Sequence, residues 1–352
     1  MGGSGKKRIL SVDVLRGLTV ACMILVNNGY GESFAQLRHS AWNGLTLSDM
    51  VFPFFLFIVG VSVNFSRKAS PGAILRRSAT ILLLGWALCY VEYALKGDLL
   101  PFAHFRLTGV LPRIALCYLA AALLMRRAGN AALAWTAGLL LAGYGVLLAL
   151  GGGFVCDEGN ILCRADRFLL GEAHLYRKSV IDPEGVLSTL PAIAHTLLGG
   201  LCGRMLIASQ PSLPLRLRRI GLYGLLLAAA GLLLCLLLPL NKRVWSPSFA
   251  LLTCGCCALL LTLLAWVIDV RGYAFWTPVF SAFGRNALAV YMLSELLSAV
   301  FSRTGLSSLL YDGLYWCCPA AKWASLLYAL CIVLINFGAA WGLYRKEIFI
   351  KV

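Results

Sequence analysis

Residues 222–240 read LYGLLLAAAGLLLCLLLPL, a run of 19 residues without a charged side chain. Runs of the same character recur at 81–91, 131–150 and 324–341. An α-helix needs about 20 consecutive apolar residues to cross the hydrocarbon core of a bilayer. The repeated runs therefore predict a protein that crosses the membrane many times.

The composition of the 352-residue chain supports this prediction. Residues of the AVILMFWYC set make up 60% of the chain, and Asp, Glu, Lys and Arg make up only 13%. Soluble domains are roughly 45–50% apolar even with glycine counted, and about 25% charged. A cytosolic, secreted or disordered protein is excluded, and the length suffices for about ten membrane spans with loops.

The hydrophobic pattern predicts an all-α, polytopic bundle of about ten transmembrane helices. Helices are expected because only a helix or a closed barrel satisfies every backbone polar group in lipid, and the runs lack the alternation of barrel strands. Residues 1–8 are expected to be a cytoplasmic leader and 9–352 a single transmembrane domain, with outer loops at 27–48 and 151–185. The ten spans are placed at about 9–28, 49–66, 77–95, 107–125, 131–150, 186–208, 217–239, 248–268, 279–302 and 322–344.

The chain has a net charge of +16, and its basic residues are distributed as the predicted topology requires. With the N-terminus inside, sixteen Lys and Arg residues fall on the cytoplasmic side and seven in the short outer loops, which is the asymmetry that the positive-inside rule describes. We therefore expect both termini in the cytoplasm and no nucleic-acid partner. The outer set is Arg38, Lys96, Arg106, Lys242, Arg243, Arg303 and Lys322.

Most of the thirteen cysteines lie in apolar spans, where a thiol acts as a small hydrophobic group. The run Cys254-Gly255-Cys256-Cys257 has no second ligand pair and no nearby histidine, so we expect no metal site there. Cys156 and Cys163 lie in the long outer loop, where an oxidising compartment allows a disulfide. The sequence leaves that pairing open.

Ionisable residues inside spans are costly and usually functional. Asp13 and Arg16 are spaced i, i+3 and can neutralise each other. Arg113 has no local partner, which favours a substrate anion or an acid on another helix. Polar packing between helices explains Asn286, Tyr291 and Glu295 about as well as a binding site does. The full set comprises Asp13, Arg16, Arg113, Arg285 and Glu295, with His195, Asn286, Tyr291 and Asn336 as polar companions.

The first outer loop carries the most reactive side chains. His39 is the one residue there that changes charge near neutral pH without help, which makes it the natural base or nucleophile. Asp49 opens the second span, where it can orient the imidazole or cap the helix. Trp42 can form the wall of a sugar site, although tryptophan is also common at membrane interfaces.

The same segments resemble the heparan-α-glucosaminide N-acetyltransferase family, comprising the lysosomal enzyme and its bacterial relatives. The resemblance covers nearly the whole transmembrane region, in order and at similar spacing. It rests on Ser11-Val12-Asp13, Arg16-Gly17, Val26-Asn27, His39, Trp42-Asn43-Gly44-Leu45-Thr46, Asp49 with Val51-Phe52-Pro53, Gly60, Gly109-Val110-Leu111 with Arg113, Asp182-Pro183-Glu184-Gly185-Val186-Leu187 with Thr189, Pro239-Leu240-Asn241-Lys242 with Trp245-Ser246, and Asn286 with Val290-Tyr291 and Glu295.

The resemblance implies a membrane-embedded enzyme that moves acetyl from acetyl-CoA to the amino group of a terminal glucosamine on the non-cytoplasmic side, without a metal. It places the family's active histidine at His39, with Asn27 and Asp49 as its neighbours. Trp42, Asn43, Arg113, Asn286 and Glu295 are expected to bind the substrates, and Arg16 and Arg285 the CoA phosphates. This chain has Ser294 where the lysosomal enzyme has a histidine.

Several alternatives stay open at this point. His39 can carry the acetyl group as an acyl-imidazole or remove the proton of the attacking amine, with Asn27 as a donor to the oxyanion. A glycan O-acetyltransferase and a transporter of amino sugars or muropeptides are the rival functions. We expect an integral protein of the bacterial inner membrane with the His39 loop facing the periplasm. A homodimer is left open.

Overall fold

The computed structural model describes residues 9–66, 69–176 and 179–350, so the predicted leader at 1–8 lies outside the described residues. The regular secondary structure of this part of the chain is entirely helical. The helices are α1 (Leu10–Asn27), α2 (Leu47–Val63), α3 (Pro71–Leu95), α4 (Val110–Arg127), α5 (Asn130–Leu150), α6 (Ile161–Leu170), α7 (Thr189–Ile207), α8 (Leu213–Leu234), α9 (Pro247–Ala265), α10 (Thr277–Arg285), α11 (Ala287–Thr304), α12 (Leu306–Cys317) and α13 (Ala321–Arg345).

Eight of the described helices are long and apolar enough to cross a membrane: α1, α2, α3, α5, α7, α8, α9 and α13. The 18-residue helices α4 and α11 occupy two further predicted spans and carry buried or half-buried charges, among them Arg113 and Glu295. The prediction of an all-α, polytopic membrane protein is therefore confirmed.

The predicted continuous span at 279–302 is wrong, because the chain breaks at Asn286 into α10 and α11. Asn286 has a backbone outside the helical region, with φ −118° and ψ 33°. Its side-chain amide donates to the Ile348 carbonyl and accepts from the Ile350 N–H. The break therefore binds the C-terminal segment. The pattern also missed the short helices α6 and α12.

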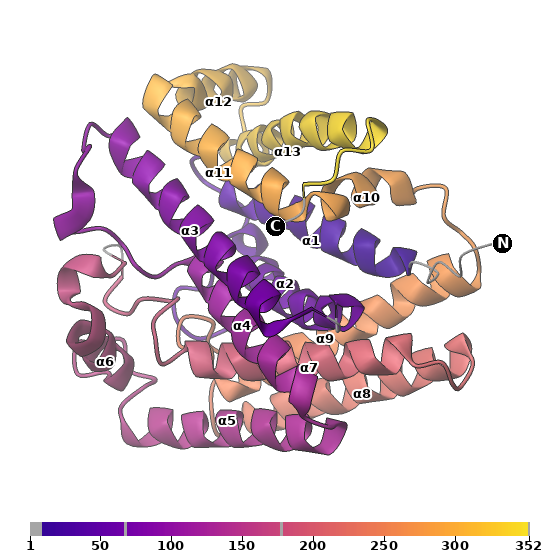
Figure 1. The fold of residues 1–352 in the computed structure, drawn as a ribbon. Helices are drawn as coiled ribbons and strands as arrows, with labels where there is room; N and C mark the ends of the chain where they lie inside the picture. Colours follow the sequence, from indigo (N-terminus) through magenta and orange to yellow (C-terminus); the bar gives the residue numbers. More distant parts are fainter. Residues whose placement is uncertain (1–8, 67–68, 177–178, 351–352) are drawn as a thin grey trace.

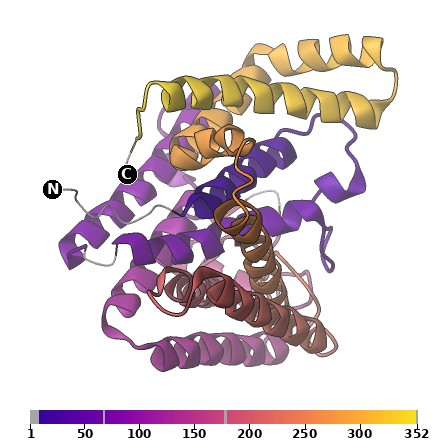
Figure 2. The same cartoon turned by 90° about the vertical axis from the view of Figure 1, so that its right-hand side faces the viewer.

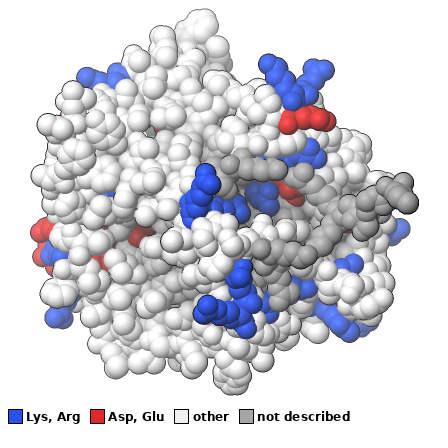
Figure 3. Space-filling view, viewed as in Figure 1, with Lys and Arg blue, Asp and Glu red and all other residues white. Residues whose placement is uncertain are grey.

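The helices form an inner and an outer set. Most of the residues in the apolar windows of α1, α2, α7 and α9 are buried, whereas α3, α5, α8 and α13 bury only a minority of theirs. The two outer helices α5 and α13 lie at opposite edges of the bundle (Figures 1 and 2). Large apolar side chains of the outer set point outwards, including Trp135, Leu150 and Leu233. Figure 3 shows broad surface areas without charged residues, as expected of a lipid-facing surface.

Glycines allow the inner helices to approach closely. A Cβ atom built on Gly60 of α2 would collide with the Thr196 carbonyl of α7, and one built on Gly199 of α7 would collide with the Phe57 carbonyl of α2. Small residues commonly permit such backbone contact between transmembrane helices. The resulting packing fixes α2, whose first turn carries Asp49, against α7.

The loops predicted for the outer side meet at one end of the bundle. The Trp42 indole donates to the Phe154 carbonyl over 2.8 Å, and the Gly44 N–H donates to the Leu240 carbonyl over 2.8 Å. These bonds join the first outer loop to the long loop and to the connection between α8 and α9. In Figure 1, α6 of the long loop lies at the left edge of the molecule. Which end faces the cytoplasm stays a prediction.

Candidate functional site

Asp49 both caps the helix α2 and contacts the imidazole of His39, the two roles that the sequence allowed. It lies in the first turn of α2, where Thr46 and Asp49 form a capping box. Its Oδ2 accepts from the N–H of Thr46 over 3.2 Å, from the Thr46 hydroxyl over 3.0 Å and from the N–H of Ser40 over 3.1 Å. Its Oδ1 is left to face the imidazole of His39. The helix cap therefore also fixes the orientation of the carboxylate.

His39 is held by this carboxylate. Its Nδ1 lies 2.9 Å from Asp49 Oδ1. The side chain of Asp49 is 1% exposed and that of His39 is 49% exposed. A carboxylate only accepts hydrogen bonds, so the proton of the neutral imidazole resides on Nδ1 and Nε2 keeps its lone pair. The geometry therefore presents a base or nucleophile on a half-exposed ring.

Lys242, a residue that the sequence reasoning counted only as a topological charge, completes the cluster. Its Nζ lies 3.0 Å from His39 Nδ1, 3.3 Å from His39 Nε2 and 3.6 Å from Asp49 Oδ1. Burial lowers the pKa of the Lys242 amine below its ordinary value, while the negative charges of Asp49 and Glu184 oppose the decrease. The one sequence feature that could have pointed to Lys242 is its position in the Pro239-Leu240-Asn241-Lys242 motif.

Two predicted sugar-binding residues of the first outer loop also hold the loops together. The Asn43 side-chain oxygen accepts from the Asn241 amide over 3.0 Å, next to Lys242 in the chain. Trp42 is half-buried, and its indole N–H is used by the Phe154 carbonyl. Asn43 thus helps to place Lys242 beside His39, and Trp42 fixes the approach of the long loop.

Asn27 contacts Glu295 instead of His39. The Asn27 amide donates to Glu295 Oε1 over 3.3 Å, joining the end of α1 to the middle of α11. Tyr291, one turn before Glu295 on α11, interacts with the same carboxylate. The predicted grouping of Tyr291 and Glu295 on one helix face is thus present in the structure, with Asn27 added to it.

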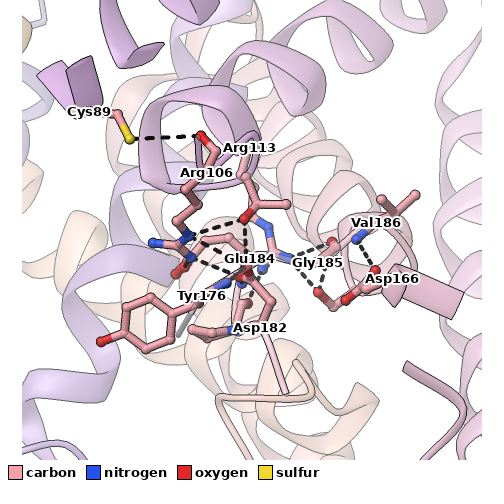
Figure 4. Close-up of polar contacts among 12 residues, drawn as sticks. Cys89, Arg106, Arg113, Asp166, Tyr176, Asp182, Glu184, Gly185 and Val186 are labelled. Carbon is pink, nitrogen blue, oxygen red and sulfur yellow. Dashed lines mark hydrogen bonds and ion pairs between the residues drawn. The ribbon is translucent and has the colours of Figure 1, made fainter. Parts of the chain in front are cut away.

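Arg113 holds the loop that leads into α7. The residue is 1% exposed, and its guanidinium donates to the carbonyls of Pro183 and Gly185 and to the Ser188 hydroxyl. The partners expected from the sequence were a substrate anion or an acid, whereas the structure supplies backbone carbonyls. Figure 4 shows the guanidinium pointing into this loop. The contacts of Arg113 are therefore those of a residue that shapes the loop.

Arg106 forms the ionic centre of the same loop (Figure 4). Its guanidinium lies 2.8 Å from Asp182 Oδ1 and 2.7 Å from Glu184 Oε2. Burial alone would raise the pKa of Asp182, but the charge of Arg106 and its hydrogen bonds lower it. Glu184 therefore has a fixed position, from which its charge acts on Lys242. Neither Arg106 nor Glu184 was predicted from the sequence to be a site residue.

Arg16 and Arg285 lie far from His39 along the bundle. Arg16 contacts Asp13 at 3.4 Å, the Ser62 hydroxyl at 2.8 Å and the Gly284 carbonyl at 3.2 Å. Ser62 follows Asp49 by 13 residues on α2, which is about 20 Å along a helix. Arg285 packs against the rings of Tyr344 and Phe349, each 5.0 Å away. Asp13 and Arg16 are therefore paired, and both arginines belong to the opposite end of the bundle.

The remaining histidine and cysteine candidates, His195, Cys156 and Cys163, lie apart from the His39–Asp49 pair in the contacts that they make. His195 is fully buried between Phe57 and Trp245 in the packed interior. Cys156 is exposed and Cys163 buried, and both carry free thiols in this structure. Among the described residues, no three His, Cys, Asp or Glu side chains gather in an arrangement that could hold a metal ion.

The fold and these contacts define an integral membrane protein with a His–Asp pair and an adjacent lysine at one end of a helical bundle. The family model described as "Heparan-alpha-glucosaminide N-acetyltransferase, catalytic" matches residues 8–163. The heparan-alpha-glucosaminide N-acetyltransferase of Mus musculus is 29% identical over 364 residues, covering 85% of this chain and 55% of the relative. The protein of that name from Homo sapiens is 28% identical over 359 residues, covering 84% and 54%.

The chain is therefore similar to the heparan-alpha-glucosaminide N-acetyltransferases over most of its length. It spans about half the length of the curated relatives that it matches. The matched family segment includes His39 and Asp49, while Lys242 lies beyond residue 163 and inside the longer alignments' share of the chain.

Proposed function

We propose that the protein transfers acetyl from acetyl-CoA to the amino group of a glucosamine-type sugar, with His39 as the base or acyl carrier. The observation that carries this proposal is the contact of His39 Nδ1 with the buried Asp49 carboxylate at 2.9 Å. The names of the relatives point to the same reaction. The catalytic end of the bundle is proposed to face the periplasm, from the inner membrane of a bacterium.

The proposed chemistry follows from the proton on Nδ1. Asp49 accepts that proton's hydrogen bond and stabilises the positive charge that the ring acquires when Nε2 takes a second proton. In direct transfer, Nε2 removes the proton from the sugar amine as its nitrogen attacks the thioester. In the two-step route, Nε2 itself attacks and holds the acetyl group before the amine takes it. Both routes use the same lone pair.

Acetyl-CoA is the proposed acetyl donor. The residues near His39 suit its thioester, whereas the arginines proposed for its phosphates already have protein partners. The His39 end supplies a base and a cation to the thioester. Arg16 and Arg285 are proposed to contact the phosphates, although both guanidinium groups already have protein partners. Trp42, Asn43, Arg113, Asn286 and Glu295 remain proposed substrate contacts, of which Trp42 and Asn43 lie in the same loop as His39.

The test uses the full chain in lipid nanodiscs with labelled acetyl-CoA and two acceptors. Product from glucosamine but not from N-acetylglucosamine supports N-acetyl transfer, whereas product from both indicates O-acetyl transfer. Uptake of glucosamine into proteoliposomes without acetyl-CoA would instead support the transporter. Acetyl recovered on the His39 peptide, after quenching with donor alone, identifies the two-step route.

The orientation can be tested on the natural cysteines. Cys156 is exposed in the long loop, so it should react with an impermeant maleimide in intact cells if the His39 end faces outwards. Cys317 is exposed as well, so the variant with both Cys156→Ser and Cys317→Ser removes this signal. Arg38→Cys in that background should restore it because Arg38 is exposed in the first outer loop. Labelling of both sites only after lysis would reverse the proposed orientation.

A further inference from the structure

Lys242 lies over the face of the His39 ring. Its Nζ is almost equally distant from the two ring nitrogens, at 3.0 Å from Nδ1 and 3.3 Å from Nε2. A donor in line with the Nε2 lone pair would lie in the ring plane and much farther from Nδ1. The in-plane lone pair of Nε2 is therefore free to act on a substrate while the ammonium group lies beside it.

A rigid turn holds Lys242 in this position. The fully buried Asn241 accepts from the Val244 N–H over 3.1 Å, and its own N–H donates to the Ser246 hydroxyl over 3.1 Å. Trp245, 1% exposed, has a φ of 52°, a left-handed conformation that costs free energy for a tryptophan. The turn keeps that conformation because the Trp245 ring packs against Phe52, Phe249 and Arg113.

The contacts of Lys242 are not those of a lysine that only neutralises an acid. The nearest carboxylate oxygen, Asp49 Oδ1, is 3.6 Å away, farther than either ring nitrogen of His39. Oδ2 of Asp49 already accepts three hydrogen bonds. Glu184 is held by Arg106 at 2.7 Å, and Arg243 turns away to the Ser179 hydroxyl. The side chain of Lys242 is only 14% exposed, so its donors are aimed into the site.

We propose that Lys242 donates to the acetyl carbonyl oxygen of the donor when negative charge develops on that oxygen. This role rests on the proposed acetyl transfer. As the nucleophilic nitrogen forms the new C–N bond, the π pair of the carbonyl moves to oxygen beside the Lys242 ammonium. When that pair returns, the C–S bond breaks and the thiolate leaves. The proton taken by His39 Nε2 then neutralises the thiolate.

This placement replaces Asn27 as the donor to the oxyanion, since the Asn27 amide donates to Glu295. The proposed role also gives a reason for the position of the Lys242 ammonium beside the imidazole of His39. The Lys242 ammonium places a positive charge beside Nε2 of His39. The same charge stabilises the oxyanion during reaction, where a preorganised donor has its largest effect.

The experiment compares Lys242→Met, Lys242→Arg and the control Arg243→Gln in the full-length protein in nanodiscs. Loss of one oxyanion donor typically lowers kcat by about 10²–10³-fold. We expect that loss in Lys242→Met, with KM for acetyl-CoA and glucosamine changed by less than about threefold, because the donor acts on charge absent from the ground state. Lys242→Arg should recover part of kcat, and Arg243→Gln should resemble the wild type.

Three results would overturn the assignment: an unchanged kcat in folded Lys242→Met, a rise in KM that accounts for the whole loss, or an Arg variant no better than Met. Lys242→Gln provides the neutral comparison if the Met variant is not monodisperse. Binding of acetyl-CoA to each variant, measured by calorimetry, should match the wild type. A wild type that transfers no acetyl refutes the proposed function itself, whereas an active wild type with an active Lys242→Met refutes only the lysine's role.

Discussion

Two His–Asp pairs lie at the same end of the bundle, and they differ in what surrounds the acid. His104 Nε2 lies 2.6 Å from Asp98 Oδ2, a shorter distance than the 2.9 Å between His39 Nδ1 and Asp49. The side chain of Asp98 is 35% exposed, whereas that of Asp49 is 1% exposed. Asp98 has one further bond, from the Leu100 N–H at 3.3 Å. A short distance alone therefore does not distinguish the two pairs.

The difference lies in preorganisation. Asp49 is fixed by three donors on one oxygen before it meets His39, so the imidazole is held without further ordering. The ring of His104 packs edge-on against Tyr93 at 5.3 Å, and the described residues place no lysine over it. A buried, capped acid and an adjacent cation, and not the pairing itself, therefore distinguish His39, the proposed base or acyl carrier, from His104.

The two pairs are linked through Arg106 and Glu184. Arg106 follows His104 by two residues and holds Glu184 at 2.7 Å, and the charge of Glu184 acts on Lys242. The His104 region thus serves as a support for the loop at 182–188, which in turn borders the His39 site. Paired substitutions in the two regions test this division of roles.

The largest expected effect is that of His39→Ala compared with His104→Ala. Removal of a general base costs about 10²–10⁴-fold in rate, and removal of a nucleophile costs more. His39→Ala should therefore lose at least this much kcat for glucosamine acetylation, while His104→Ala should stay within about threefold of the wild type. Both variants should elute as the wild type does in size-exclusion chromatography. Equal losses in the two variants would remove the distinction between the pairs.

A smaller effect is expected from Asp49→Asn compared with Asp98→Asn. The amide introduced by Asp49→Asn can donate to Nδ1 of His39, which would move the ring proton to Nε2 and block the reactive lone pair. We expect about a 10²-fold loss of kcat for Asp49→Asn, and some loss of thermal stability because the helix cap is weakened. Asp98→Asn should change neither quantity appreciably. Full activity of Asp49→Asn would show that the acid only caps the helix.

Much of the fold could be predicted because membrane burial imposes one dominant pattern on the sequence. The long apolar runs predicted the eight described helices that are able to span a membrane, and the helix α4 was also predicted despite Arg113. The break at Asn286 was not predicted, because the hydrogen bonds that replace the helix come from Ile348 and Ile350, about 60 residues away in the chain. Long-range partners of this kind leave no local signal.

The site was predictable only where its residues are close in sequence. His39 and Asp49 are ten residues apart, and the helix start between them brings them together. Lys242 reaches the same point through the contact of its loop with Asn43 and Gly44, which no spacing within the chain indicates. Arg113 was predicted to meet an anion, yet its partners are carbonyls of a loop whose fold had to be known first.

The smallest predicted effect concerns the pH dependence of the loop that joins the two regions. Asp166 of α6 is 1% exposed and accepts from the Val186 N–H over 2.8 Å. Burial raises the pKa of Asp166 to about 6, and the charge of Asp182 adds to that increase. A carboxyl whose pKa is higher in the folded state binds its proton more tightly there than in the unfolded chain. Its contribution to stability is complete below about pH 4 and is lost as the pH rises through about 6.

The variant Asp166→Asn mimics the protonated side chain and should not lose this contribution. A shift of about two pKa units corresponds to at most about 3 kcal/mol, so the apparent Tm of the wild type should fall relative to Asp166→Asn by a few degrees between pH 4.5 and 7. The difference between the two proteins is the measured quantity, because Asp182, whose pKa is lowered, gives the opposite trend in both. A constant difference across this range would mean that Asp166 stays ionised in the folded loop, and that the support for Glu184 does not depend on its proton.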